Sequence, residues 1–272
     1  MYSQPEQRPL TLTESCAVGA FAAAGEVVFP GQILTYGMNQ AIKGHHFVPE
    51  NCYRGFTANA IGEMPIGAAQ KIVQTMLSAY TESSQQEELS VAQKMLISYL
   101  AGVAGACIDT PSSMIQLYVQ DDLHAKKTFW RAAIELRSKA FRGFLPNAFI
   151  KEGIFCCGYQ SLATQTEKLV GNYTDNQPTQ KIIGGIGAGL ITAMLTQPGA
   201  VLRNKMQNEL LRPNQQLSTL SETITNHYKT EGLRGFWKGF RQRGSRITIA
   251  VPLYSAYSNF LEKQLRSYHK QP

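Results

Sequence analysis

The chain of 272 residues lacks the residue patterns that mark common enzyme and metal sites. It has no Ser-His-Asp set, no glycine-rich phosphate loop and no paired spacing of metal ligands, so we expect no enzyme chemistry, no metal and no cofactor. The five cysteines contain no Cys-x-x-Cys pair, and His45-His46 has no partner at a zinc-site spacing. Most cysteines stand in or beside apolar segments, which favours free thiols: Cys16, Cys52, Cys107, Cys156 and Cys157.

Charges and long apolar runs are also scarce. Charged residues make up 17% of the chain, and the hydrophobic fraction of 43% with a mean hydropathy of −0.19 would also suit an ordinary soluble protein. Only residues 182–202 form an uncomplicated apolar span. Six candidate spans can still be drawn: 16–37, 57–80, 95–119, 144–163, 181–203 and 244–262. Most contain one or two charges, and because a charge is costly in lipid, these predict helix faces that line a water-filled cavity.

A proline closes or interrupts an apolar run three times, at Pro30, Pro111 and Pro198, with spacings of 81 and 87 residues. Each proline is followed by an aromatic residue near a basic residue and a glycine: Tyr53-Arg54-Gly55, Phe141-Arg142-Gly143 and Trp237-Lys238-Gly239. We therefore predict three repeats after a disordered arm: 1–15 for the arm, then 16–89, 90–178 and 179–272. A proline inside a helix removes one backbone hydrogen bond, so a kink is expected at each of the three.

These residues resemble the mitochondrial carrier family, whose three repeats carry Pro-x-Asp/Glu-x-x-Lys/Arg-x-Lys/Arg-x-Gln. The third copy has Pro198, Arg203, Lys205 and Gln207, whereas the second keeps Pro111 and Gln120, and the first keeps Pro30 with Asn39 in place of glutamine. The resemblance implies an all-α membrane protein with six transmembrane helices in three tandem helix-loop-helix repeats and pseudo-three-fold symmetry. It also implies a monomer in the mitochondrial inner membrane.

The basic residues gather in the loops inside the repeats, at 38–56, 120–143 and 203–243, whereas the connectors between repeats are acidic or balanced. Such an asymmetry predicts both termini on one side of the membrane and the basic loops on the other. A net charge of +7 also allows nucleic-acid binding. Here the basic residues alternate with apolar spans instead of forming one stripe, so we expect no nucleic-acid partner.

The second helices of the three repeats align on their basic-glycine steps. Four residues past the glycine stand Asn59, Asn147 and Arg243, and seven past it stand Gly62, Ile150 and Arg246. Positions three apart lie on one helix face, so a three-fold bundle directs both sets to its axis. In the family the second set falls at the level where substrate is bound. With Lys151 nearby, Arg243 and Arg246 predict a site for an anionic substrate.

Two alternatives remain open at this site. Arg243 and Arg246 can instead be interfacial residues that reach lipid headgroups, and Lys151-Glu152 is equally well read as an internal ion pair. Gly62 opposite Arg246 leaves room for a planar group, which favours a nucleotide. A one-residue slip makes Lys151-Glu152 look like the basic-acidic pair of amino-acid carriers in the family.

The gate that the family closes by ion pairs near the prolines lacks its charges here. The acidic positions hold Gln32, Ser113 and Ala200, and the basic positions hold Thr35, Gln116 and Arg203, so no ion pair can form among them. Neutral hydrogen bonds, such as one between Gln32 and Gln116, are weaker than charge-assisted bonds. The gate is therefore either held closed more weakly than in the family, or it belongs to a relative that no longer transports.

The basic-glycine steps have a separate interpretation. Free backbone N–H groups at a helix start attract anions, and the family binds cardiolipin at such steps. The resemblance thus implies lipid-phosphate sites at Arg54-Gly55, Arg142-Gly143 and Lys238-Gly239. Glycines that merely begin a helix explain the pattern equally well.

Together these patterns predict a carrier that exchanges a small anionic metabolite, preferably a nucleotide such as ATP or ADP, by alternating access without covalent chemistry. A non-transporting membrane adaptor on the same scaffold is the alternative, favoured by the missing gate charges. A soluble basic binding protein ranks third.

Overall fold

The computed structural model describes residues 11–26, 31–53, 56–85, 89–121, 127–212 and 216–268. Pro30, Arg54 and Gly55 lie outside these residues, as do the first ten residues of the predicted arm. Within the described ranges every regular element is a helix, which confirms the all-α class. The six membrane spans, the three-fold symmetry and the repeat boundaries stay predictions.

The chain forms long helices and, between some of them, shorter helical segments. The elements are α1 (Leu12–Glu26), α2 (Gln32–Lys43), η2 (Pro49–Asn51), α3 (Phe56–Gln85), α4 (Val91–Gln120), α5 (Phe129–Leu136), η4 (Arg137–Phe141), η5 (Pro146–Glu152), α6 (Gly153–Cys156), η6 (Cys157–Leu162), α7 (Ala163–Gly171), α8 (Gln177–Glu209), α9 (Leu220–Gly235) and α10 (Phe240–Tyr268). The elements η5 to α7 follow one another without a break and act as one long helix, here called helix 146–171. The short elements η2, α5 and α9 lie in the basic loops.

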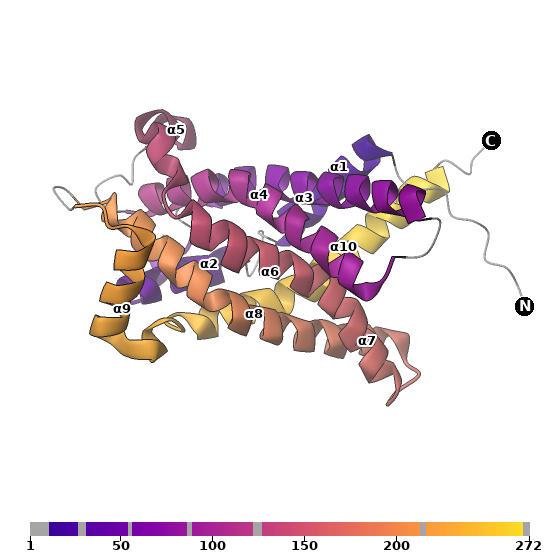
Figure 1. Cartoon of the computed structure of the whole chain (residues 1–272). Coiled ribbons are helices and arrows are strands. Elements are labelled where there is room, and N and C mark those ends of the chain that lie inside the picture. Colours follow the sequence, from indigo (N-terminus) through magenta and orange to yellow (C-terminus); the bar gives the residue numbers. More distant parts are fainter. Residues whose placement is uncertain are drawn as a thin grey trace, which may run out of the picture.

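The long helices pack side by side in a ring. Going round it, α1 contacts α3, α3 contacts α4, α4 contacts helix 146–171, that helix contacts α8, α8 contacts α10, and α10 returns to α1. Figure 1 shows α5 and α9 at one end of the bundle, and the start of α1 and the end of α10 at the other. We name the first of these the basic-loop end.

Glycines allow two of these helix pairs to approach closely. A Cβ atom placed on Gly19 of α1 would collide with the backbone of Gly67 on α3, and the reverse is also true. On α4, a Cβ on Gly102 would meet the backbone at Glu152. Small residues at such contacts let helix backbones pack tightly in lipid. The contacts set the diameter of the ring and hence the space at its centre.

Helices α4 and α8 are long and apolar enough to cross a membrane among the helices of the described residues. Pro111 and Pro198 lie inside them, and both helices continue past the proline. The kinks expected at these prolines stay predictions. Several large apolar side chains of the two helices point outward, among them Leu96, Leu100, Leu190 and Met194.

Helix 146–171 differs from the other long helices because it contains two π-helical segments, Pro146–Glu152 and Cys157–Leu162. A π-helix has hydrogen bonds from residue i to i+5, so each turn accommodates about one extra residue. The side chains beyond such a segment are rotated relative to those of an α-helix of the same length. This rotation decides which residues of the helix reach the centre of the ring.

Candidate functional site

A cavity of about 1120 Å³, its open mouth included, lies inside the ring and receives side chains from α1, α2, α3, α4, helix 146–171, α8 and α10. Its size suits a small-molecule site. Of the residues that the structure describes, seven charged ones line it, four basic and three acidic: Lys151, Arg203, Arg243 and Arg246, with Glu63, Asp109 and Glu152. The cavity is therefore amphoteric, with one basic group in excess.

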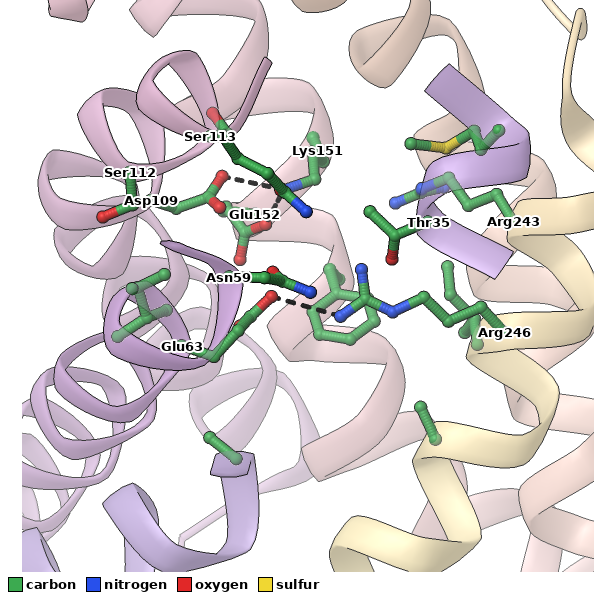
Figure 2. A pocket seen from close by; sticks show the side chains of 18 of the residues that line it. Thr35, Asn59, Glu63, Asp109, Ser112, Ser113, Lys151, Glu152, Arg243 and Arg246 are labelled. Carbon is green, nitrogen blue, oxygen red and sulfur yellow. Dashed lines mark hydrogen bonds and ion pairs between the residues drawn. The ribbon is translucent and has the colours of Figure 1, made fainter. Parts of the chain in front are cut away.

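Arg246 and Glu63 face each other across the cavity (Figure 2). The Nη2 atom of Arg246 on α10 donates to Oε1 of Glu63 on α3 at 3.1 Å. Both side chains keep about a fifth of their surface exposed, at 19% and 21%. The pair thus offers a cation and an anion, side by side, to anything that enters.

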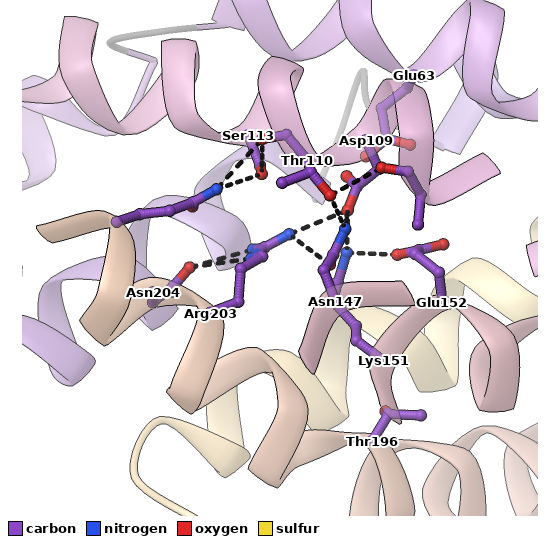
Figure 3. Close-up of polar contacts among 12 residues, drawn as sticks. Glu63, Asp109, Thr110, Ser113, Asn147, Lys151, Glu152, Thr196, Arg203 and Asn204 are labelled. Atoms are coloured by element: carbon purple, nitrogen blue, oxygen red, sulfur yellow. Dashed lines mark hydrogen bonds and ion pairs between the residues drawn. The ribbon is translucent and has the colours of Figure 1, made fainter. Parts of the chain in front are cut away.

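Asp109 on α4 connects three helices (Figure 3). Its Oδ2 atom accepts from Lys151 Nζ at 2.8 Å, from Asn147 Nδ2 at 2.8 Å and from Arg203 Nη1 at 3.1 Å. Lys151 and Asn147 come from the π-helical start of helix 146–171, and Arg203 comes from α8. A buried carboxylate is tolerated only with such partners, so the arrangement ties the three helices together.

Glu152 is the third carboxylate of the cavity and is almost fully buried. It accepts from the neighbouring Lys151, and its Oε2 atom accepts from Gln70 Nε2 on α3 at 3.2 Å. The internal Lys151-Glu152 ion pair, one of the two interpretations of these residues, is thus present. Lys151 also lines the cavity, so the pair does not exclude substrate contact.

Arg243 is the basic residue of the cavity that has no carboxylate within ion-pairing distance among the described residues. Its Nη1 atom donates to Thr196 Oγ1 at 2.6 Å and to the Ala193 carbonyl at 3.4 Å, both on α8. The side chain is only 4% exposed. A buried guanidinium without an acidic partner is a ready site for an incoming carboxylate.

Five residues of the predicted substrate set line the cavity: Asn59, Gly62, Lys151, Arg243 and Arg246. Asn147 does not, because it is buried in the Asp109 network, where it also bonds Thr110 at 2.8 Å. The prediction for Ile150 needs correction, since Ile150 is absent from the lining and lies against Gly199 of α8. The π-helical start supplies the extra residue that brings Lys151 to the cavity in its place.

Polar residues of the lining that the substrate prediction did not name include Glu63, Asp109 and Gln70. Two of them could have been predicted, because Glu63 and Asp109 are charged residues inside apolar stretches, and such residues usually face a cavity. Gln70 carried no comparable signal. Its role depends on Glu152, which is distant in the sequence.

The predicted gate residues divide into two groups. Thr35, Ser113, Gln116 and Arg203 line the cavity, whereas Gln32 and Ala200 are buried outside its lining. Gln32 donates to the Cys52 carbonyl at 3.3 Å and accepts from Asn59 at 2.9 Å, while the side-chain nitrogen of Gln116 is buried with no hydrogen-bond partner in the described part of the chain. The suggested Gln32–Gln116 contact is therefore replaced by contacts along the first repeat.

Among the described residues, the six predicted gate positions form no ion pair with one another, but one of them has an acidic partner outside the set. Arg203 does form an ion pair, with Asp109, which stands four residues before Ser113 on α4. The prediction considered only the motif position itself. One helical turn separates residues 109 and 113, so both lie on the same face and either position can direct an acid toward α8.

Between this ion pair and the basic-loop end, polar side chains of α2, α4 and α8 form what we call the amide layer. Asn39 Nδ2 donates to Gln120 Oε1 at 2.9 Å, and Asn204 Nδ2 donates to Asn39 Oδ1 at 3.1 Å. Gln207 Nε2 donates to Ser113 Oγ at 3.3 Å and to the Thr110 carbonyl at 3.2 Å. These bonds join the C-terminal halves of all three helices.

The described basic-glycine steps are engaged within the protein. Arg142 donates to Glu209 at 2.6 Å and to the Ser218 carbonyl, and Lys238 lies 3.4 Å from Glu231. Gly143 and Gly239 have φ values of +79° and +75°, which only glycine adopts readily. The backbone conformation thus accounts for these two glycines, and lipid binding at the steps stays a prediction.

Helix α9 carries a second charged cluster outside the ring. Lys205 and Lys238 both pair with Glu231, and His227 lies beside them with its ring edge-on to Phe236. Burial opposes ionisation of Glu231, but the bond to Lys205 and the nearby lysines hold its pKa below the usual 4.5. Burial, with the charge of Lys205, lowers the pKa of His227 below 6.5. Both shifts favour the forms present at neutral pH.

A ring of long helices around an amphoteric central cavity defines an α-helical protein with a polar, charged cavity at its axis. Residues 174–269 match the family described as "Mitochondrial carrier protein". This match covers the last third of the chain, and it supports the resemblance to a divergent mitochondrial carrier and hence to an integral membrane protein.

Known relatives agree with this assignment. The mitochondrial glycine transporter of Ovis aries is 27% identical over 171 residues, which cover 59% of this chain and 54% of the relative. The probable mitochondrial 2-oxoglutarate/malate carrier protein of Dictyostelium discoideum is 24% identical over 208 residues, 69% of this chain and 65% of the relative. The mitochondrial thiamine pyrophosphate carrier 1 of Candida albicans is 30% identical over 91 residues, 33% and 29% of the two chains. The chain thus spans about half to two thirds of the length of the first two relatives that it matches.

Proposed function

We propose that this protein carries a small metabolite across the mitochondrial inner membrane by alternating access, and that an amino acid is its substrate. The observation that carries the proposal is the charge arrangement of the cavity. Arg243 has no carboxylate partner among the described residues, and Arg246 shares the cavity with Glu63. The Ovis aries relative is named as a glycine transporter, which agrees with this substrate class.

A zwitterion matches this arrangement better than a multiply charged anion does. Its carboxylate can bind the excess guanidinium of Arg243. Alternatively, its carboxylate can displace Glu63 from Arg246, and its ammonium group can then pair with the released carboxylate of Glu63. Since a buried charge needs a partner, each group that enters must find an opposite charge. ATP or ADP brings several negative charges to a cavity with one excess positive charge, so the nucleotide prediction gains no support from the cavity or from the relatives named above.

Uptake into liposomes that contain the purified protein tests this proposal. We expect saturable uptake of radiolabelled glycine or another small amino acid. If the protein exchanges substrates, uptake is faster into liposomes that were preloaded with the same unlabelled compound. The panel includes 2-oxoglutarate, malate, thiamine pyrophosphate, ATP and ADP, with protein-free liposomes as the control. Uptake of nucleotides without uptake of any amino acid contradicts the proposed substrate class.

A non-transporting adaptor remains the second candidate. It is favoured by the neutral residues Gln32, Ser113 and Ala200 at the three acidic motif positions. A wild-type protein that inserts and folds but moves no member of the panel supports the adaptor. Binding without transport is measured separately, since a ligand that binds the folded state raises its melting temperature.

The proposed orientation has both termini on one side of the membrane and the basic loops on the other. Cysteines introduced at Ser3 and at Lys229 are expected to react with an impermeant thiol reagent from opposite sides. Labelling of both from the same side contradicts the orientation. A monomer bound to cardiolipin completes the proposal, and added cardiolipin is expected to raise the melting temperature of the purified protein.

A further inference from the structure

Gln70 on α3 contacts a residue of a helix that is not its neighbour in the ring. Its Nε2 atom donates to Oε2 of Glu152 at 3.2 Å, although α4 stands between α3 and helix 146–171. Gln70 is only 4% exposed, and both residues line the cavity. Because a buried amide and a buried carboxylate each need a hydrogen-bond partner, each residue satisfies the other.

Two glycines of α4 make room for this contact. A Cβ atom on Gly105 would lie 2.7 Å from Cγ and 2.8 Å from Nε2 of Gln70, which is closer than such atoms approach. One turn earlier, a Cβ atom on Gly102 would meet the backbone of Glu152. We call the helix face that these two glycines leave open the glycine notch. The notch admits the Gln70 side chain at one point and the Glu152 backbone at the other.

The two carboxylate oxygens of Glu152 are bound by different partners. Oε1 accepts from Lys151, and Oε2 accepts from Gln70. Lys151 is shared, because it also donates to Asp109 at 2.8 Å. Among the described residues, Gln70 is therefore the donor that occupies the second oxygen of Glu152 without bringing a charge. With that oxygen occupied, a cation in the cavity finds less of the carboxylate to bind.

We propose that Gln70 is a positioning residue that holds Glu152 at the glycine notch and so sets which charges the cavity accepts. With both of its oxygens bound, Glu152 balances Lys151, and the cavity keeps its excess of one basic group for a substrate with one carboxylate. Once Gln70 is removed, Oε2 needs a new donor, and a second ammonium group on the substrate can supply it. This selectivity rests on the proposed function, whereas the positioning of Glu152 does not.

Carboxylate labelling tests the positioning without any substrate. The purified protein reacts with a water-soluble carbodiimide and an amine, and peptide mass spectrometry measures the amide formed at each carboxylate. Glu63 serves as the internal reference, because it lines the same cavity and its side chain is 21% exposed. The quantity compared is the labelling rate at Glu152 relative to that at Glu63, since a change in the access of reagent to the cavity affects both.

We expect Gln70→Leu to raise this relative rate about ten-fold or more, the usual size of the effect when a charged group loses a hydrogen bond. Gly105→Ala is expected to raise it too, since the added Cβ atom displaces Gln70 from the side of α4. The matched control is Ser98→Ala, which removes a hydrogen bond of 3.1 Å between α4 and helix 146–171 outside the cavity lining. We expect this control to leave the relative rate unchanged.

Uptake into liposomes tests the selectivity. We expect Gln70→Leu and Gly105→Ala to raise the uptake of free lysine relative to that of free glycine about ten-fold. The double variant Gln70→Leu/Glu152→Gln is expected to remove this rise, because it removes the carboxylate through which Gln70 acts. Gly105→Ala leaves both polar residues in place, so it keeps the test valid if Gln70→Leu fails to fold.

An unchanged relative labelling rate in both Gln70→Leu and Gly105→Ala overturns the positioning role. An equal rise in Ser98→Ala also overturns it, because the rise then reflects general loosening of the helices. Raised labelling without a change in selectivity overturns the part of the proposal that concerns the substrate. If the wild-type protein takes up no amino acid, the proposed function fails together with this selectivity, and the labelling rates still decide whether Gln70 positions Glu152.

Discussion

The protein contains two clusters of ion pairs that resemble each other in chemistry and differ in burial. The cavity cluster consists of Asp109, Lys151, Glu152 and Arg203, whose side chains are 6% to 13% exposed. The α9 cluster consists of Lys205, Glu231 and Lys238, whose side chains are 25% to 38% exposed. Both clusters place lysine against carboxylate at hydrogen-bonding distance.

The difference in burial determines what each cluster can do. Ion pairs near water contribute little to stability, because solvent competes for both partners. In the cavity each charge depends on its partners, so a molecule that offers a competing charge can rearrange them. The same residue types therefore form a responsive site in one place and a surface contact in the other.

The largest difference is expected from the removal of one lysine from each cluster. Lys151→Met leaves Glu152 with Gln70 as its remaining hydrogen-bond partner among the described residues and takes one donor from Asp109, so we expect a loss of about 3–5 kcal/mol in the free energy of unfolding. Lys205→Met is the control at the α9 cluster, with an expected loss below about 1 kcal/mol. Chemical unfolding in detergent measures both, and equal losses contradict the comparison.

Arg246→Ala removes one partner of the Arg246–Glu63 ion pair, which is accessible from the cavity. The loss of one hydrogen bond to a charged group costs about 1.5–3 kcal/mol, so uptake is expected to fall by about ten- to a hundred-fold. Arg246→Lys is expected to recover part of it, because an ammonium group keeps the charge without the two-pronged geometry. Uptake at the wild-type rate in Arg246→Ala shows that the substrate site lies elsewhere.

A smaller effect is expected from Ile150, the residue that the π-helical segment turns away from the cavity. Ile150→Val removes one methylene against α8 and is expected to cost about 0.5–1.5 kcal/mol of stability, toward the lower value because the side chain is half-buried. Uptake should stay unchanged. A selective loss of uptake at full stability restores Ile150 to the substrate site.

The smallest effect concerns pH at the α9 cluster, where Lys205, Lys238 and Glu231 face His227. Because the pKa of His227 is lowered in the folded state, the unfolded chain takes up protons more readily below pH 6.5. The contribution of His227 to the free energy of unfolding is thus complete above pH 6.5, and it is lost as the pH falls through the pKa that His227 has in the folded state. Glu231, whose pKa is also lowered in the folded state, adds a further loss of stability below pH 4.5.

We therefore expect the melting temperature to fall on mild acidification, and His227→Gln to reduce that fall in the range just below pH 6.5. Glu231→Gln is the control, because its effect on the pH dependence begins at lower pH through its own titration. A pH dependence that His227→Gln leaves unchanged shows that another group titrates there.

Much of the fold was predictable because it follows from local pattern. Apolar stretches of helix length gave the helices, and the basic-loop segments near Phe129 and Leu220 formed short helices as their apolar spacing favours. The register of helix 146–171 was not predictable from the alignment of the repeats. An extra residue in a π-helical turn depends on packing against α4 and α8, which no spacing within the helix reveals.

The sequence by itself determined the helical class, the resemblance to mitochondrial carriers and the residue types available to the cavity. Arg243 and Arg246 stand three apart in one helix, so they share a face whatever surrounds them. Only the tertiary structure decided the distant partners, because the charges at residues 63 and 109 meet their bases across 183 and 94 positions of chain. Helix packing sets such distances, and burial then decides whether each pair is a surface contact or part of a site.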